Sequence, residues 1–242
     1  MADTDGPAQP APYRLRWYDL VTLQVASIGA GALLIGIIAW AGATAFLESY
    51  TGFALMLSIG DLLLLLLSLR CLRRDAALPV QPRPLSGRTW AILIAAASLL
   101  VWLSVVYEQI CGALFHVDLG SAEKAMPLVT RHISQLPAGF VTIVLIGPAA
   151  EEVYFRGLLM GWLSRHWGMG WAIAGSALLF GLFHLEFLRP GGGAGLVFTV
   201  ELVASGIVLG LAAARTGSLW ASFAIHAVNN LCVMLLQFFS PF

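Results

Sequence analysis

Three short patterns of ionisable and amide side chains stand in the second half of a chain that is otherwise strongly apolar. They read Glu151-Glu152-Val-Tyr-Phe-Arg156, Phe180-Gly-Leu-Phe-His184 and His226-Ala-Val-Asn-Asn230. A carboxylate, two histidines and an amide suit the activation of water, because the carboxylate takes a proton and a histidine positions the water molecule. His226 and Asn230 would donate hydrogen bonds to a developing oxyanion. The set therefore predicts hydrolysis of an amide bond.

The spacing within the first pattern separates its two glutamates. Glu152 and Arg156 are one helical turn apart, with the glutamate N-terminal to the arginine, which is the better orientation for an ion pair. Glu151 points about 100° away around the helix, so we expect it to face a cavity. Pro148 lies one turn before Glu151 and lacks a backbone donor. A kink there would leave carbonyls free beside the site.

A metal is the alternative to a carboxylate that acts alone. Glu151, His184 and His226 have the His₂Glu composition of known catalytic zinc sites. They come from three separate stretches of sequence, without the i, i+4 histidine pair that organises HExxH sites, and no GxSxG serine motif is present. Ser222 lies one turn before His226, but hydroxyls in membrane helices usually bond to backbone. We therefore favour a mechanism that requires no cofactor and keep zinc as the alternative.

The composition determines the environment in which this chemistry would take place. The 242 residues are 59% hydrophobic and only 11% charged, with a mean hydropathy of +0.86, whereas soluble domains carry about 25% charged residues. The fold class predicted is an all-α, polytopic transmembrane helical bundle whose first partner is the lipid bilayer. Thirteen basic residues balance thirteen acidic ones, so nothing points to nucleic acid, and the substrate expected is a membrane-associated peptide or protein. Ionisable groups cost at least a few kcal/mol inside a bilayer, which makes each one a functional candidate.

Seven stretches are long and apolar enough to span a membrane: 19–46, 51–70, 89–107, 138–165, 171–187, 196–214 and 218–239. We expect a flexible cytoplasmic tail over 1–17, N-terminal transmembrane helices with their loops over 18–137, and a catalytic core over 138–239. The connection 108–137 is long enough for an amphipathic interfacial helix that ends near Pro137. The proline-rich stretch 79–84 is predicted to be a cytoplasmic linker.

The arginines predict the orientation through the positive-inside rule. With a cytoplasmic N-terminus, nine of them fall on one side: Arg14, Arg16, Arg70, Arg73, Arg74, Arg83, Arg88, Arg165 and Arg215. The other side keeps Lys124, Arg131 and Arg189. We therefore expect a multi-pass protein of the cell (inner) membrane with the N-terminus inside and the C-terminus outside.

Over roughly residues 138–239 the chain resembles the CAAX protease and bacteriocin-processing family, also called the Abi family, of intramembrane endopeptidases. Its motifs EExxxR, FxxxH and HxxxN/D occur here in the same order. The family includes the Ras-converting endopeptidase, which removes the last three residues of prenylated proteins. The resemblance implies the following roles: Glu151 as catalytic base, His184 as the residue that orients water, His226 and Asn230 as oxyanion donors, and Glu152 and Arg156, with Phe180 packed beside them, as support.

Two other classes of function remain open at this point. A non-catalytic immunity or binding protein of the same fold would keep the motifs without the activity. A proton-coupled transporter would use Glu151, Glu201 and Asp61 as a relay, although carriers often show paired halves and the polar residues here cluster in one half. We expect no catalytic role for Asp61 or Glu201, nor for Asn229, which points off the His226 face.

Overall fold

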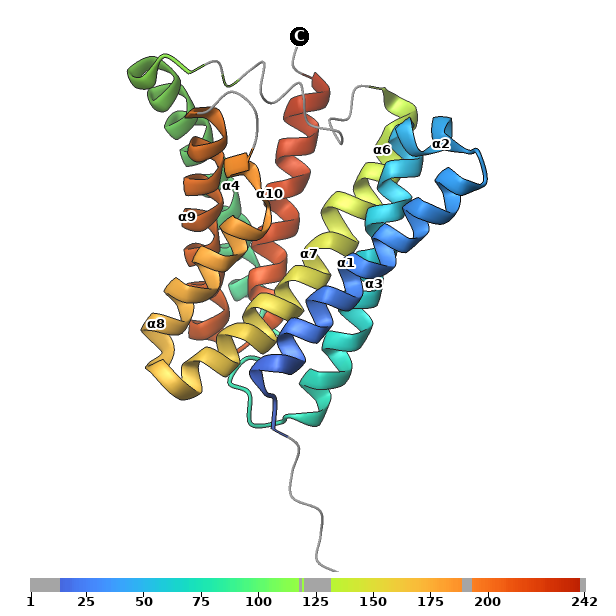
Figure 1. The fold of residues 1–242 in the computed structure, drawn as a ribbon. Coiled ribbons are helices and arrows are strands. Elements are labelled where there is room, and N and C mark those ends of the chain that lie inside the picture. Colours follow the sequence, from blue (N-terminus) through green and yellow to red (C-terminus); the bar gives the residue numbers. More distant parts are fainter. Residues whose placement is uncertain (1–13, 118, 120–131, 189–192, 240–242) are drawn as a thin grey trace, which may run out of the picture.

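The computed structural model describes residues 14–117, 119, 132–188 and 193–239, and the regular elements of this part of the chain are all helices (Figure 1). The predicted all-α membrane bundle is confirmed. Its elements are α1 (Trp17–Trp40), α2 (Thr44–Glu48), α3 (Tyr50–Arg74), α4 (Gly87–Phe115), η1 (Ile133–Gln135), α6 (Leu136–Gly139), η2 (Phe140–Ile146), α7 (Gly147–Glu151), η3 (Glu152–Leu159), α8 (Met160–Phe183), η4 (Glu186–Leu188), α9 (Gly193–Thr216) and α10 (Leu219–Phe239).

Six helices in the described part of the chain are long and apolar enough to cross a membrane. One of them is the 51-residue run Ile133–Phe183, which joins the two stretches predicted at 138–165 and 171–187. The run doubles back at Gly168, whose φ of 78° and ψ of 163° interrupt the helix. Because a positive φ is easy only for glycine, this residue allows one apolar run to supply two passages (Figure 1).

The boundaries of two other segments differ from the prediction. The first helix was expected over 19–46, but α1 ends at Trp40 and α2 follows it, because Gly42 takes a positive φ of 75° between them. The stretch 79–84, predicted to be a linker, lies between α3 and α4, and part of it is packed against the bundle. Val80 is fully buried, and Gln81 bonds through its backbone to both Gly217 and Leu219. Within 108–137, where an interfacial helix was expected, residues 108–115 instead extend α4 and Ile133–Gln135 form η1, while 118 and 120–131 lie outside the described residues.

The ends of the helices define two faces of the bundle. α1 begins and α10 ends at opposite faces (Figure 1), as an odd number of passages requires. One face carries the start of α1, the 75–86 loop, the turn at Gly168 and the start of α10. All nine arginines assigned to the predicted cytoplasmic side lie at this end of their helices and are exposed, and we call it the arginine-rich face.

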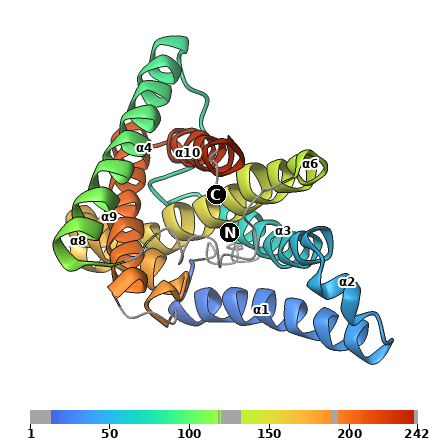
Figure 2. The same ribbon diagram turned by 90° about the horizontal axis from the view of Figure 1, so that it is seen from above.

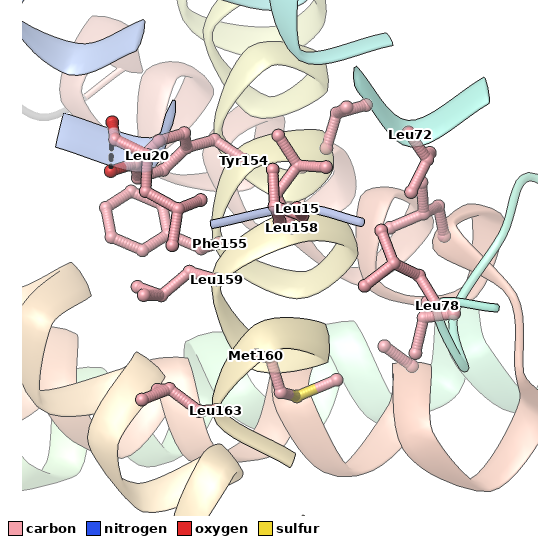
Figure 3. Close-up of a cluster of buried hydrophobic side chains, with 14 of the residues drawn as sticks. Leu15, Leu20, Leu72, Leu78, Tyr154, Phe155, Leu158, Leu159, Met160 and Leu163 are labelled. Atoms are coloured by element: carbon pink, nitrogen blue, oxygen red, sulfur yellow. Dashed lines mark hydrogen bonds between the residues drawn. The ribbon is translucent and has the colours of Figure 1, made fainter. Parts of the chain in front are cut away.

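A hydrophobic core lies just inside the arginine-rich face, around η3. Every residue of η3 is buried, because the run from α6 to α8 crosses the middle of the bundle while α1 packs on its outside against α3 (Figure 2). Leu72, Leu78, Leu158 and Met160 are at most 1% exposed and belong to this core (Figure 3). The core therefore seals the bundle between the arginine-rich face and the middle of the membrane.

Asp75, at the end of α3, ties three segments together on this face. Arg165 donates two hydrogen bonds to its carboxylate, at 2.7 and 2.6 Å, and the backbone N–H of Leu15 donates a third at 2.8 Å. These bonds, the one from Arg165 above all, hold the pKa of Asp75 below its usual range. The side chain is only 2% exposed, so the three donors replace the water that it loses.

Asp75→Asn should lower the free energy of unfolding by about 1–3 kcal/mol, because Arg165 loses its charged partner. A carboxylate with a depressed pKa contributes its stability above the unfolded-state pKa and loses it as the pH falls through the lower folded-state value. The difference between wild type and variant should therefore be full near pH 6 and shrink below about pH 4. Thermal unfolding in detergent across this pH range measures it. Arg73→Gln, which removes an exposed charge from the same face, is the control, and an equal loss in both variants would contradict the assignment.

Candidate active site

The two glutamates of the first pattern stand at the junction of α7 and η3. The preceding η2 is a π-helix, in which Gly147 donates its backbone N–H to Thr142 five residues back. With the same five-residue spacing, the carbonyl of Ile143 would accept a hydrogen bond from the backbone nitrogen of residue 148. That residue is proline, which has no N–H to donate. The expected kink at Pro148 thus takes the form of wide turns on either side of α7. Such turns are frequent at functional sites.

Glu152 and Arg156 form the ion pair that their spacing predicts. Arg156 Nη1 donates to Glu152 Oε1 at 2.8 Å, and the two side chains are 0% and 1% exposed. Arg156 Nη2 donates to the carbonyl of Gly206 on α9 at 3.2 Å, and its guanidinium lies 4.4 Å from the centre of the Phe180 ring. A Cβ at position 206 would lie 3.0 Å from Ala177, so glycine permits the close approach of α8 and α9.

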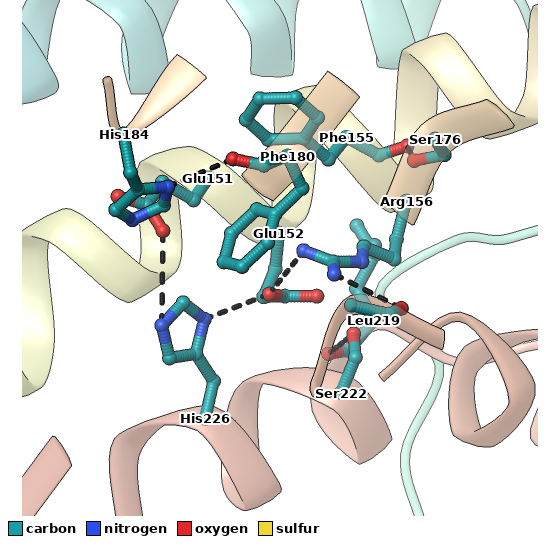
Figure 4. Close-up of polar contacts among 11 residues, drawn as sticks. Glu151, Glu152, Phe155, Arg156, Ser176, Phe180, His184, Leu219, Ser222 and His226 are labelled. Atoms are coloured by element: carbon teal, nitrogen blue, oxygen red, sulfur yellow. Dashed lines mark hydrogen bonds and ion pairs between the residues drawn. The ribbon is translucent and has the colours of Figure 1, made fainter. Parts of the chain in front are cut away.

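His226 on α10 lies between the two glutamates (Figure 4). Its Nδ1 is 2.8 Å from Glu152 Oε1, a hydrogen-bond distance, and its Nε2 is 3.7 Å from Glu151 Oε2. The Glu152 carboxylate can only accept, so Nδ1 carries a proton. The buried ion pair therefore fixes the tautomer and the ring orientation and directs Nε2 at Glu151.

His184 is oriented in the same way by its own helix. Its Nδ1 lies 2.8 Å from the carbonyl oxygen of Phe180, one turn back, so the proton is on Nδ1. In the neutral ring, Nε2 is then an acceptor. The FxxxH spacing serves this bond, and the Phe180 ring also packs edge-on against both His184 and His226.

Asn230 has a structural task in addition to the one predicted. Its Nδ2 donates to the carbonyl of Ile143 at 2.9 Å, the carbonyl that the missing N–H of Pro148 leaves without a donor. This bond ties α10 to η2. An amide nitrogen carries two hydrogens, so one remains available to a ligand.

The four predicted residues line a single cavity of about 430 Å³, a size typical of small-ligand sites. Glu151, His184, His226 and Asn230 all reach its wall, whereas Glu152, Arg156 and Phe180 lie behind it. Ser222 lies outside the lining and donates to the backbone of Leu219, as expected of a hydroxyl in a membrane helix. The structure thus brings together the residues of all three patterns.

Other polar residues reach the same cavity, and their place there was not predicted. They include Asp61 on α3, Glu108 on α4, Glu186 on η4, Glu201 on α9 and Asn229 on α10. The cost of an intramembrane charge marked Asp61 and Glu201 as unusual, but only the packing of separate helices shows which cavity they share. Asp61 also lies against α7, with Oδ2 3.6 Å from the place of a Cβ at Gly147.

The zinc alternative finds no preformed site among the described residues. They include no group of three or more histidine, cysteine, aspartate or glutamate side chains placed to hold a metal ion. His226 Nδ1 is already bonded to Glu152, which leaves only Nε2 for a ligand. As they are placed, the described residues do not form a zinc site of His₂Glu composition.

Comparison with known proteins agrees with the motifs. Residues 133–232 match the family model described as Type II CAAX prenyl endopeptidase Rce1-like. The match covers 100 of the 242 residues, and over this stretch the chain is similar to the Rce1-like family. The matched stretch contains all four candidate residues and their support, whereas Asp61 and Glu108 lie in the N-terminal helices outside it. The family named by this match is the one that the three motifs resemble. No curated protein and no solved structure matches the chain.

Arg156→Ala should destabilise the protein by about 3–5 kcal/mol, because it leaves the buried Glu152 without its partner. Arg156→Lys, which keeps the charge but loses the planar two-donor geometry, should fall between wild type and alanine. Thermal unfolding in detergent measures both, with Arg215→Ala at an exposed position as the control. If Arg156→Ala is inactive but as stable as wild type, Arg156 binds substrate instead.

Proposed function

We propose that the protein is an intramembrane endopeptidase that hydrolyses a peptide bond of a membrane-associated protein or peptide with water activated by Glu151. The observation that supports this best is the arrangement of Glu151 and His226. A carboxylate and an imidazole nitrogen face each other across 3.7 Å at the wall of a cavity. This separation is too long for a direct hydrogen bond, and a water molecule beside the pair, in the cavity, could contact both groups.

In the proposed reaction, Glu151 takes a proton from water while the water oxygen attacks the scissile carbonyl carbon. His184 Nε2 accepts the second hydrogen of the water and fixes its direction. The carbonyl oxygen becomes an oxyanion, which accepts hydrogen bonds from the free Asn230 N–H and from His226 in its protonated form. Glu151 then returns its proton to the amide nitrogen as the C–N bond breaks, which yields a carboxylic acid and an amine. The acid then loses its remaining proton to solvent or to the released amine.

The Glu152–Arg156 pair has a supporting part in this proposal. An imidazolium that forms at His226 would be stabilised by Glu152, whose oxygen already accepts its Nδ1–H at 2.8 Å. Arg156 lies behind Glu152 and keeps it ionised. Fixed charges of this kind need no rearrangement as charge develops, which is the main source of electrostatic catalysis.

The two other functional classes fit the site less well. A proton-coupled carrier needs a path that connects the two faces of the bundle. The described cavity does not reach the arginine-rich face, because the hydrophobic core lies between that face and His226. A non-catalytic immunity protein would share the fold and the ion pair. It gives no reason for Glu151 to be held opposite the free nitrogen of His226, and an activity measurement separates it from an enzyme.

Glu151→Gln keeps the shape of the side chain and removes the base, so cleavage should fall by at least about 10²- to 10⁴-fold. Folding and substrate binding should remain largely intact. Cleavage is measured by mass spectrometry of membrane proteins from cells that express either form. Glu201→Gln makes the same change elsewhere on the cavity wall and should keep a larger share of the activity. Robust cleavage by Glu151→Gln would refute the assignment.

Metal content tests the proposed mechanism independently. The purified enzyme should contain well under one zinc ion per chain and should keep its activity after prolonged chelation. Elemental analysis and a cleavage assay before and after chelation measure both. Stoichiometric zinc that is lost and restored together with activity would replace the glutamate-only mechanism by the His₂Glu alternative.

A further inference from the structure

The cavity lies in one half of the bundle, which α10 shows most clearly. From Leu219 to His226 one face of this helix is packed into the protein, with Ala221, Ser222 and Ile225 at most 2% exposed. Beyond His226 the cavity lining follows one face of α10 as far as Gln237, near its other end. At about 1.5 Å per residue, the lining begins about 10 Å above the first residue of α10.

The other helices that line the cavity do so from the same half. α3 and α9 run toward the arginine-rich face and contribute residues from the half away from it: Leu57 and Asp61 from α3, and Phe198, Glu201 and Leu202 from α9. α4 runs the opposite way and contributes Glu108, close to its far end. No described residue of the lining comes from the 75–86 loop or from the turns at 168 and 217.

The floor of the cavity is closed toward the arginine-rich face. Behind Glu151 and His226 lie the buried Glu152 and Arg156, which are at most 1% exposed. Next come Phe155, Leu158 and Met160, which are at most 4% exposed. This packing continues to the loop residues Leu78 and Val80. In the described structure a polypeptide that approached from the arginine-rich face would therefore have to unpack the core to reach Glu151.

The distribution of basic residues indicates which half of the bundle faces the cytoplasm. Nine arginines mark one face, and an excess of arginine and lysine next to membrane helices identifies the cytoplasmic side. The remaining basic residues apart from the buried Arg156 are Lys124, Arg131 and Arg189, which are outside the described part of the chain. They belong to connections between helix ends on the opposite face.

We propose that the active site is reached from the extracytoplasmic side of the membrane. This inference rests on the proposed function and narrows the substrate to a membrane-associated peptide or protein whose scissile bond lies at or beyond the outer leaflet. A prenylated C-terminal tail held in the cytoplasmic leaflet would meet the closed floor instead. The best-known target of the related family is therefore not the substrate that this cavity admits.

Thiol labelling from each side of the membrane tests the proposal. Cys71, Cys111 and Cys232 are first replaced by alanine, and single cysteines are then introduced. Val233→Cys places a thiol on the cavity wall of α10, and Leu57→Cys does so from α3, so that one remains if the other misfolds. Arg88→Cys marks the arginine-rich face, and Leu99→Cys, exposed on the outside of α4, marks the lipid surface.

A membrane-impermeant cationic methanethiosulfonate is applied to right-side-out spheroplasts and to inverted vesicles. The two cavity cysteines should react in spheroplasts at least tenfold faster than in inverted vesicles, and Arg88→Cys should show the reverse. Leu99→Cys should react in neither. Cavity cysteines that react only in inverted vesicles, or in neither preparation, would overturn the proposal. The measurement does not depend on catalysis, so adding Glu151→Gln to each variant should leave the labelling pattern unchanged. An inactive wild type with the expected pattern would refute the function but not the direction of access.

Discussion

The ion pair between Glu152 and Arg156 is the interaction on which the site depends. Two fully buried charges are costly inside a membrane unless each is paired and bonded, and this requirement fixes the neighbours of both. Arg156 needs the carbonyl of Gly206, which brings α9 close to α8. Glu152 takes the proton of His226 Nδ1, which orients α10. One local pair thus sets the relative positions of three helices and aims a histidine at Glu151.

The sequence predicted those parts of the site that depend on local geometry. The i, i+4 spacing of Glu152 and Arg156, the separate direction of Glu151 and the Phe180–His184 pair are properties of single helices. The bond between His226 and Glu152 joins residues 74 positions apart, and nothing in either pattern specifies it. The sequence marked Asp61 as an unusual charge but could not place it or Glu108 in the cavity, because a shared cavity arises only when helices pack together.

The fold was predicted in the same uneven way. Hydropathy identifies apolar runs, so the seven stretches were recognised. It does not show at which residue the chain turns. Gly42 ended the first helix early, and Gly168 folded one helical run back on itself, because both depend on a backbone angle. Pro148 was noticed as a missing donor. The hydrogen bond from Asn230 to the Ile143 carbonyl was not predicted. It depends on the π-helical turns of η2, which no residue pattern in the sequence indicates.

The turn at Gly168 has a consequence for the surrounding lipid. From Met169 to Phe183 the returning leg of α8 has about 15 residues and so spans about 22 Å, whereas the hydrocarbon core of a bilayer is about 30 Å thick. A hydrophobic segment that is too short is accommodated by local thinning of the bilayer. Lipid headgroups beside His184 would then lie several ångströms deeper than elsewhere, and an incoming polar backbone would cross correspondingly less hydrocarbon before it meets Glu151.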